Sequence, residues 1–423
     1  MNLRKTFFFA LVTLPPFQLM ADEMNIIDTY QKRYSQLPFR ETPFADIKGI
    51  FPISDKLAQG RKHYLLTYDN LDRVVEMQFL QDGKTVPLNI NKNVVTNAPH
   101  IKITFSDNKE VRTFFDQFGQ ATQSNGAFKE VYSLNNKGER VALQFEDKAG
   151  NKITNNWGIY QYTWDIDAKG TVTEQRIDKN GQAAKIRPGF PFFCLKLHYD
   201  QRGFLAMMEN FGKDCKTLTQ NNVNAAQDKL TYNKHGFMYS WNVYDAQENR
   251  AKGNGPNVAT GMMEHDSYGN TTREYYLDEF GNQIHNAYGW FDSIATYDNH
   301  GNMSARFNYD PDGNKARIES LGYSGYKLTY DKQGINRTSL SYYDQHDKPT
   351  MHLQRGYHSV QHFYNAQNQV IKIQFLDLQG KLTNRLDNGI AYIEYEYTAA
   401  GLKRINYDKK SKQINKKSDA QPT

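Results

Sequence analysis

The chain has 423 residues, of which 52 are lysine or arginine and 46 are aspartate or glutamate, giving a formal net charge of +6. Both signs are interspersed, so the charge gives little support for binding to nucleic acid or to an anionic membrane surface. The sequence contains 28 tyrosines and 25 phenylalanines, yet its mean hydropathy is −0.77. A polar chain rich in aromatic residues is typical of half-buried strands joined by tight turns, and argues against one large globular core.

Residues 1–21 are predicted to be a cleaved secretory signal peptide. Arg4 and Lys5 give a positive start, and a mostly apolar stretch follows, with a small residue at the cleavage position. The alternative is an N-terminal membrane anchor, but the apolar stretch is short and is broken by Pro15 and Pro16. No later stretch has the length and apolarity of a transmembrane helix. We therefore expect a protein exported to the periplasm.

Residues 22–56 are predicted to form a short helix followed by a linker. Ile26, Tyr30 and Tyr34 recur at helical spacing, and Pro38 would end the helix. Such a helix would cap the first edge of the structure that follows, because an open sheet edge invites aggregation.

From residue 57 to residue 411 the sequence repeats about every 33 residues, in about ten units. The clearest marker is an aromatic residue that opens a turn and is usually followed by Asp or Asn. Its members are Tyr132, Trp164, Tyr199, Tyr232, His265, Tyr297, Tyr330, Tyr364 and Tyr397. Residues 412–423 are rich in lysine and are predicted to be a basic, flexible tail.

Each unit carries a second turn about 12 residues after the first and a third marker at its end. The two turns of the best preserved unit use Asp298, Gly301, Asn302, Asp310, Gly313 and Asn314. The third marker reads Gly126, Gly158, Gly189, Asn222, Gly255, Gly289, Gly322, Gly356 and Gly389. Asparagine is its one substitute and also readily adopts positive φ, so this slot is predicted to need a left-handed backbone.

Residues between the turns alternate as they do in strands. In 370–375, Ile371, Ile373 and Phe375 share one face, and polar side chains occupy the other. The sequence therefore predicts an all-β fold, an elongated antiparallel β-repeat array with a short N-terminal capping helix.

The phrase Tyr-Asp-x-x-Gly-Asn at 297–302 and 309–314 resembles the YD repeats of Rhs-type proteins, and more loosely the variant MORN repeats. The resemblance implies antiparallel β-hairpins laid side by side and implies no chemistry. The chain departs from Rhs proteins because its repeat is a doublet, it is too short for a closed shell, and no toxin domain follows. Its layout, a signal peptide before a repeat array, is similar to periplasmic accessory proteins of type VI secretion.

Two stretches have the oxygen-rich look of a calcium loop, Asp165–Gly170 and Asp310–Asn314. A calcium hand needs oxygen ligands at its odd positions, glycine at the sixth and a bidentate glutamate at the twelfth, and neither stretch fits. The alternative is a β-turn in which the aspartate accepts hydrogen bonds from backbone N–H groups. We predict turns here, and no metal or other cofactor.

The remaining chemical candidates are weak. His352, His358 and His362 lack the spacing of a zinc site. Gly322–Gly325 is not a nucleophile elbow, because its second glycine comes one residue early. We therefore predict no catalytic residues and a protein that is not an enzyme.

Cys194 and Cys215 are the only two cysteines. An even count in an oxidising compartment favours a disulfide. A plain three-stranded meander would place a strand between them and separate them by roughly 9–10 Å, which is too far for a bond. A disulfide would then require the third segment to fold back beside the first.

The sequence favours a periplasmic scaffold that binds another protein of the cell envelope and organises or localises a secretion or contact-dependent machine. Two alternatives stay open. One is an immunity protein that neutralises a periplasmic toxin, and the other is a module that binds glycan or peptidoglycan.

If the Asp-Gly-Asn stretches are turns and not calcium sites, EDTA should leave the melting temperature of the purified protein unchanged. A substantial fall in the melting temperature, restored by added calcium, would contradict the turn interpretation.

Overall fold

The computed structural model describes residues 29–88, 97–187, 190, 192–398 and 401–414. The predicted signal peptide, Gly189 and most of the predicted tail lie outside the described residues. Residues 412–414 still belong to the last unit, because the Ile414 N–H donates to the Asn406 carbonyl at 2.8 Å.

The predicted all-β repeat array is confirmed, and the described residues form one antiparallel sheet of 27 strands. The first elements are β1 (Tyr30–Gln36), β2 (Ile50–Pro52), α1 (Asp55–Ala58), β3 (His63–Tyr68), β4 (Val74–Gln81), β5 (Lys84–Thr85), β6 (His100–Ser106) and β7 (Lys109–Phe115). The middle elements are β8 (Lys129–Leu134), β9 (Arg140–Glu146), β10 (Lys152–Ile153), β11 (Gln161–Ile166), β12 (Val172–Ile177), β13 (Cys194–Tyr199), β14 (Leu205–Phe211), β15 (Gln227–Tyr232), β16 (Met238–Tyr244), β17 (Thr260–His265), β18 (Thr271–Leu277) and β19 (Gln283–Ile284). The last elements are β20 (Asp292–Tyr297), β21 (Met303–Tyr309), β22 (Gly325–Tyr330), β23 (Arg337–Tyr343), β24 (Ser359–Tyr364), β25 (Val370–Leu376), β26 (Tyr392–Thr398) and β27 (Gly401–Tyr407).

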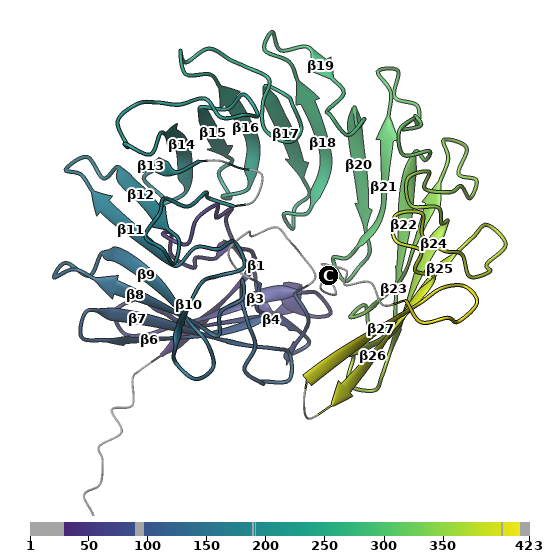
Figure 1. Cartoon of the computed structure of the whole chain (residues 1–423), viewed down its shortest axis with the longest axis horizontal. Coiled ribbons are helices and arrows are strands. Elements are labelled where there is room, and N and C mark those ends of the chain that lie inside the picture. Colours follow the sequence, from purple (N-terminus) through teal and green to yellow (C-terminus); the bar gives the residue numbers. More distant parts are fainter. Residues whose placement is uncertain (1–28, 89–96, 188–189, 191, 399–400, 415–423) are drawn as a thin grey trace, which may run out of the picture.

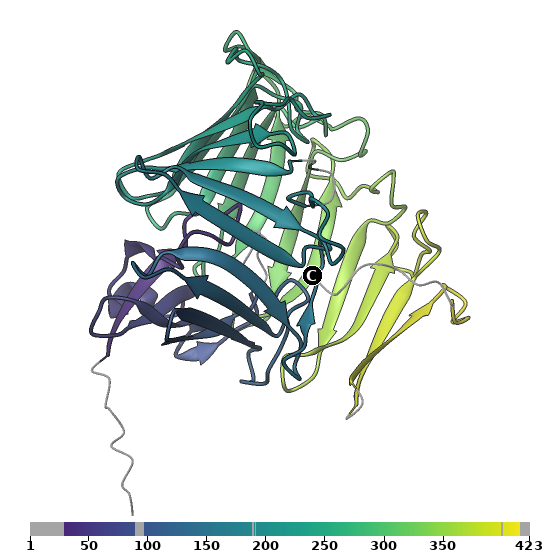
Figure 2. The same cartoon turned by 60° about the vertical axis from the view of Figure 1, so that its left-hand side comes forward.

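From β3 onward the long strands follow one another through the sheet, while the two-residue strands β5, β10 and β19 each pair only with the strand before them. β1 pairs with the free edge of β3. The sheet does not run straight, but curls until its later strands pass close to its beginning (Figure 1). At this approach the Gln81 side chain at the end of β4 donates to the Gln333 carbonyl at 2.6 Å. The green and yellow strands continue the curve beyond this point (Figure 2).

The predicted N-terminal capping helix is wrong for the described part of residues 22–56. Tyr30–Gln36 form β1, which pairs with β3 from Tyr30↔Tyr68 to Tyr34↔Tyr64. A spacing of four residues places side chains on one face of a strand as well as of a helix, and the unpaired edge of β3 decides between them. The only helix among the described residues is the four-residue α1. No helix in this part of the chain is long and apolar enough to cross a membrane.

The first turn has the same geometry in most of the described units. In the best preserved unit the Asp298 carboxylate accepts hydrogen bonds from the backbone N–H groups of His300 and Asn302, both at 2.9 Å. Gly301 adopts a φ of 82° between them. The aspartate thus closes the turn onto its own backbone, as an Asx turn does.

Two earlier units differ from the predicted register. Their turns are opened by Leu134 and Ile166, the last residues of β8 and β11, while Tyr132 and Trp164 lie two residues earlier. Because side chains two apart in a strand share a face, an aromatic residue can sit at either position and still reach the same core. The turn-opening position predicted from the sequence is therefore two residues too early in these two units.

The third marker is left-handed in most described units, with φ of 87°, 81°, 73° and 78° at Gly289, Gly322, Gly356 and Gly389. An asparagine does replace the glycine in one unit, as predicted, but it is Asn224, with a φ of 58°, and not Asn222. Gly255 is not left-handed, and the positive φ values fall at Asn254 and Asn257 instead.

The structure joins Cys194 and Cys215 in a disulfide, with their Cα atoms 5.4 Å apart. Cys194 pairs with Phe211 across β13 and β14, and Cys215 lies in the turn that starts at Gly212. Cys215 is therefore not on a third strand, and the geometric difficulty predicted for this bond does not arise.

Residues 37–62, which we call the inner segment, cross the inside of the curl between β1 and β3. Near their middle, Ile50 is buried against Phe204 and Phe237. Near their end, the Gly60 carbonyl lies 2.7 Å from His300 Nδ1. The inner segment thus connects the beginning of the sheet with units far along the chain.

Two turn glycines have nearly equal backbone angles but different surroundings, so alanine substitutions at the two positions distinguish the cost of backbone strain from the cost of overpacking. Gly269 (φ 91°) has no room for a Cβ, which would lie 2.3 Å from the buried Phe237 ring, whereas Gly281 (φ 89°) has open space. Gly281→Ala should cost about 1–2 kcal/mol from its left-handed backbone. Gly269→Ala should cost about 1–3 kcal/mol more through overpacking. Chemical denaturation measures both, and equal losses would contradict the packing argument.

Candidate functional site

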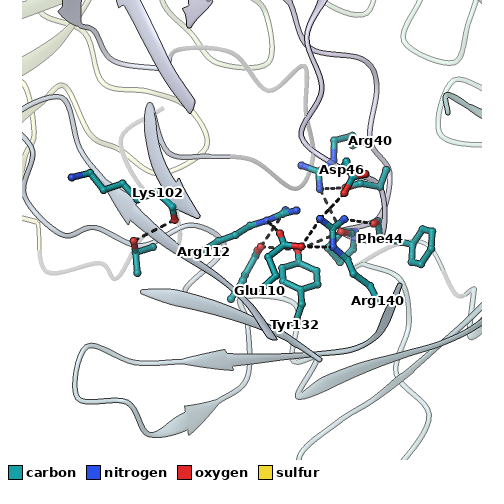
Figure 3. A network of polar contacts seen from close by, with 12 residues as sticks. Arg40, Phe44, Asp46, Lys102, Glu110, Arg112, Tyr132 and Arg140 are labelled. Carbon is teal, nitrogen blue, oxygen red and sulfur yellow. Dashed lines mark hydrogen bonds and ion pairs between the residues drawn. The ribbon is translucent and has the colours of Figure 1, made fainter. Parts of the chain in front are cut away.

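A buried network of charged residues lies where β7, β8 and β9 meet the inner segment (Figure 3). Glu110 sits between two arginines, 2.7 Å from Arg112 Nε and 2.6 Å from Arg140 Nη2. The Tyr132 hydroxyl donates to the Glu130 carboxylate at 2.9 Å. All five side chains are buried, so the network holds the strands and the inner segment together.

A second buried pair continues this pattern on β12. Arg176 donates to Glu174, and the Trp164 indole donates to the same carboxylate at 2.8 Å. Burial raises the pKa of Glu174, although Arg176 opposes the shift. Removing one partner from such a pair leaves a buried charge alone and is strongly destabilising. We read both networks as structural.

Sequence reasoning missed these networks. Their signal is glutamate and arginine two residues apart on one strand, as in Glu110/Arg112 and Glu174/Arg176. The same spacing is common on solvated strand faces, so only the tertiary structure shows that these faces are covered.

A hollow of about 740 Å³ lies between the N-terminal strands and the inner face of β20 to β26. From the N-terminal side it is lined by residues of β1, β3 and β4, and by Lys62 at the end of the inner segment. Its tyrosines are Tyr64, Tyr268, Tyr297, Tyr326, Tyr330, Tyr364 and Tyr397. This volume lies within the range of about 300–1,000 Å³ that is usual for ligand sites.

Four of these tyrosines occupy the turn-opening slot of successive units and link each unit to the one before. Between β21 and β22 the ladder covers only three residue pairs, from Ala305↔Lys327 to Phe307↔Gly325. Beyond it the Tyr330 hydroxyl donates to the Met303 carbonyl at 3.0 Å. The equivalent bonds run from Tyr297 to Thr271, Tyr364 to Arg337 and Tyr397 to Val370. Their hydroxyls are therefore held by the fold while the residues line the hollow.

The charged residues that line the hollow are basic. They are Lys62 and Arg337, with His362 beside them, and no aspartate or glutamate is among the described lining residues. Lys62 Nζ donates to Asn302 Oδ1 at 2.8 Å and to the Ile335 carbonyl at 3.2 Å. Burial lowers the pKa of Lys62 to about 8.

His362 is buried on β24 and faces Arg337, whose Nη2 lies 3.4 Å from His362 Nε2. Burial, and secondly the charge of Arg337, lower the pKa of His362 to about 4. His362 is therefore neutral at pH 7, and its Nδ1 has no hydrogen-bond partner within the described residues.

The predicted turn residues do not form this hollow as a set. Gly301 and Asn302 line it, but Asp310 lies in an exposed turn, where its carboxylate accepts from the N–H groups of Asp312 at 3.0 Å and Asn314 at 2.8 Å. The residues of the former calcium candidate thus form the second turn of their unit. In the described part of the chain no three His, Cys, Asp or Glu side chains gather as a metal site would require.

The chain matches no protein-family model and no curated protein. The crystal structure of TcdB2-TccC3 is similar at 13% identity and a TM-score of 0.27, over 82% of this chain and 14% of that chain. A Photorhabdus luminescens Tc holotoxin pore with a mutated TccC3 has 11% identity and a TM-score of 0.25, over 85% and 21%. A porin-like protein from Bacteroides uniformis has 11% identity and a TM-score of 0.20, over 72% and 96%.

The chain therefore spans less than a quarter of the toxin chains, and likenesses this distant assign no partner. Its own strand order defines it as a tandem β-hairpin repeat protein.

The buried His362 makes a prediction about acid stability. The pKa of His362 is about 4 in the folded protein and 6.5 in the unfolded chain. Between these two pH values, His362 is therefore protonated only in the unfolded chain. Stability should therefore fall as the pH falls through this window, by on the order of 3 kcal/mol for this group. Urea unfolding at several pH values measures the slope, which His362→Gln should flatten. The exposed turn variant His346→Gln is the control, and equal slopes in all three proteins would contradict the assignment.

Proposed function

We propose that this chain is a non-enzymatic protein-binding scaffold of the periplasm, exported by its signal peptide. Its partner is a protein of an envelope secretion or contact-dependent machine, such as type VI secretion, which the scaffold organises or localises. The observation that carries the proposal is the tyrosine-lined hollow on the inner face of β20 to β26.

Several properties of the hollow support contact with a macromolecule. Tyrosine gives a large contact area with few rotatable bonds and is enriched where proteins bind one another. Tyr326, Leu328, Leu340 and Ile373 add an apolar surface from neighbouring strands. Because the strands are tied together by the tyrosine hydroxyls, this surface is held in place before a partner arrives, which lowers the entropic cost of binding.

A second candidate is a glycan-binding module, favoured by the row of tyrosines along the hollow. Aromatic rings in a row can stack on sugar rings. Sedimentation with purified peptidoglycan sacculi separates this role from protein binding.

Two adjacent residues of β22 test the scaffold. Leu328 lines the hollow, whereas Thr329 is exposed, because successive strand residues point to opposite faces. Wild type and Thr329→Glu, used as immobilised bait with envelope extract, should recover the same protein, and Leu328→Glu should not. All three baits are first checked for equal melting temperature. Failure of wild type to recover any specific protein, or full recovery by Leu328→Glu, would overturn the proposal.

A further inference from the structure

The inner segment shows what the inner face of this sheet can bind. In the first half of the array, the Tyr132 hydroxyl lies 3.3 Å from the Pro43 carbonyl. Phe44 packs against Trp164 and Tyr199, with ring centroids 5.5 and 5.8 Å apart. The inner face of these units is thus covered by a stretch of polypeptide from the same chain, in which Pro43 and Phe44 form a turn.

The inner segment continues across the inner face of the following units. Lys48 lies over the Phe204 ring at 5.5 Å, and Phe51 packs on Phe237 at 5.6 Å. At its end, Lys62 accepts a hydrogen bond on its carbonyl from the Tyr268 hydroxyl at 3.0 Å. Beyond this point the chain continues into β3. The inner segment therefore does not cover the inner face of the later units.

The same strand positions are open in the second half of the array. Tyr199 and Tyr232 hold the turn-opening slot where the inner segment lies, and Tyr297, Tyr330, Tyr364 and Tyr397 hold it along the hollow. Two residues earlier on the strands, Tyr132 and Trp164 correspond to Leu328 and His362. A groove built from one repeated pattern is therefore filled in its first half and open in its second.

One charged position makes the correspondence specific. Arg140 is the first residue of β9 and pairs with Leu134, and Arg337 is the first residue of β23 and pairs with Tyr330. Arg140 Nη2 forms an ion pair with Asp46 of the inner segment at 2.7 Å, and its Nη1 donates to the Phe44 carbonyl (Figure 3).

Arg337 has no such partner, since no carboxylate of the described residues lies within ion-pair distance of it, and its Nη2 lies 3.4 Å from His362 Nε2. His362 Nδ1 is likewise a buried polar atom without a partner in this part of the structure. The open half thus presents a guanidinium without a carboxylate partner and an unpaired imidazole nitrogen, where the filled half binds a carboxylate and a backbone carbonyl.

We propose that the hollow binds an acidic polypeptide segment of a partner protein, in which a carboxylate meets Arg337 as Asp46 meets Arg140. This rests on the proposed scaffold function and names the kind of segment that it receives. A polypeptide is favoured over a glycan because equivalent positions of the same sheet already hold a polypeptide segment, through Pro43, Phe44 and Asp46. The charge is acidic because the ionised groups lining the hollow are basic.

The test uses the full chain and three labelled peptides blocked at both ends. The peptides alternate threonine with glutamate, with glutamine or with lysine, so that only their side-chain charge differs. Fluorescence anisotropy should show binding of the glutamate peptide and much weaker binding of the other two. Arg337→Gln should weaken binding of the glutamate peptide about three- to tenfold, and Arg337→Lys should restore part of the loss. Arg317→Gln is the control, because Arg317 pairs with Glu319 and does not line the hollow.

Several results would overturn the inference. One is equal affinity for all three peptides, another is equal loss in Arg337→Gln and Arg317→Gln, and a third is no binding of the glutamate peptide. Binding of an acidic oligosaccharide that depends on Arg337, without binding of the peptide, would assign the hollow to a glycan. If envelope protein is still captured when the peptide test fails, the scaffold function stands and its contact surface lies elsewhere.

Discussion

In the later units, the hydrogen bond from the turn-opening tyrosine to a carbonyl of the preceding unit is the link on which the architecture depends. It is made by Tyr232, Tyr297, Tyr330, Tyr364 and Tyr397. Strands pair over six positions within the hairpin of β20 and β21, but over only three between β21 and β22. Neighbouring units therefore diverge beyond the short ladder, and the tyrosine hydroxyl satisfies a carbonyl at that end. Repeated along the chain, this divergence is consistent with the curl that produces an inner face and a hollow.

The fold class could be predicted because each unit repeats its turn chemistry. Asp298 and Gly301 identify their turn from local rules alone, since both act on the backbone next to them. The predictions failed where contacts with residues distant in the sequence determine the local structure. Tyr34 satisfies helix and strand spacing equally, and only the edge of β3 makes its segment a strand. The slip between Tyr132 and Leu134 has a related cause, because a shared strand face cannot distinguish positions two apart.

The candidate site was less predictable than the fold. Four of the seven tyrosines of the hollow were predicted, but only as turn residues, because sequence does not show which face closes around a cavity. Arg140 and Arg337 hold equivalent positions and look alike in sequence. What distinguishes them is whether the inner segment covers their unit, and that depends on where residues 37–62 run in three dimensions. The pairing of Cys194 with Cys215 likewise depended on the path of one turn.

The tyrosine link also bears on how such a chain can change over generations. Each of these bonds joins one unit only to its immediate neighbour, so duplication or loss of one whole unit would break a single junction and form another of the same kind. Such an event leaves every other turn, ladder and hydroxyl bond as it was. The length of the open groove can therefore change in discrete steps of one hairpin pair, independently of the covered half that anchors the N-terminal segment.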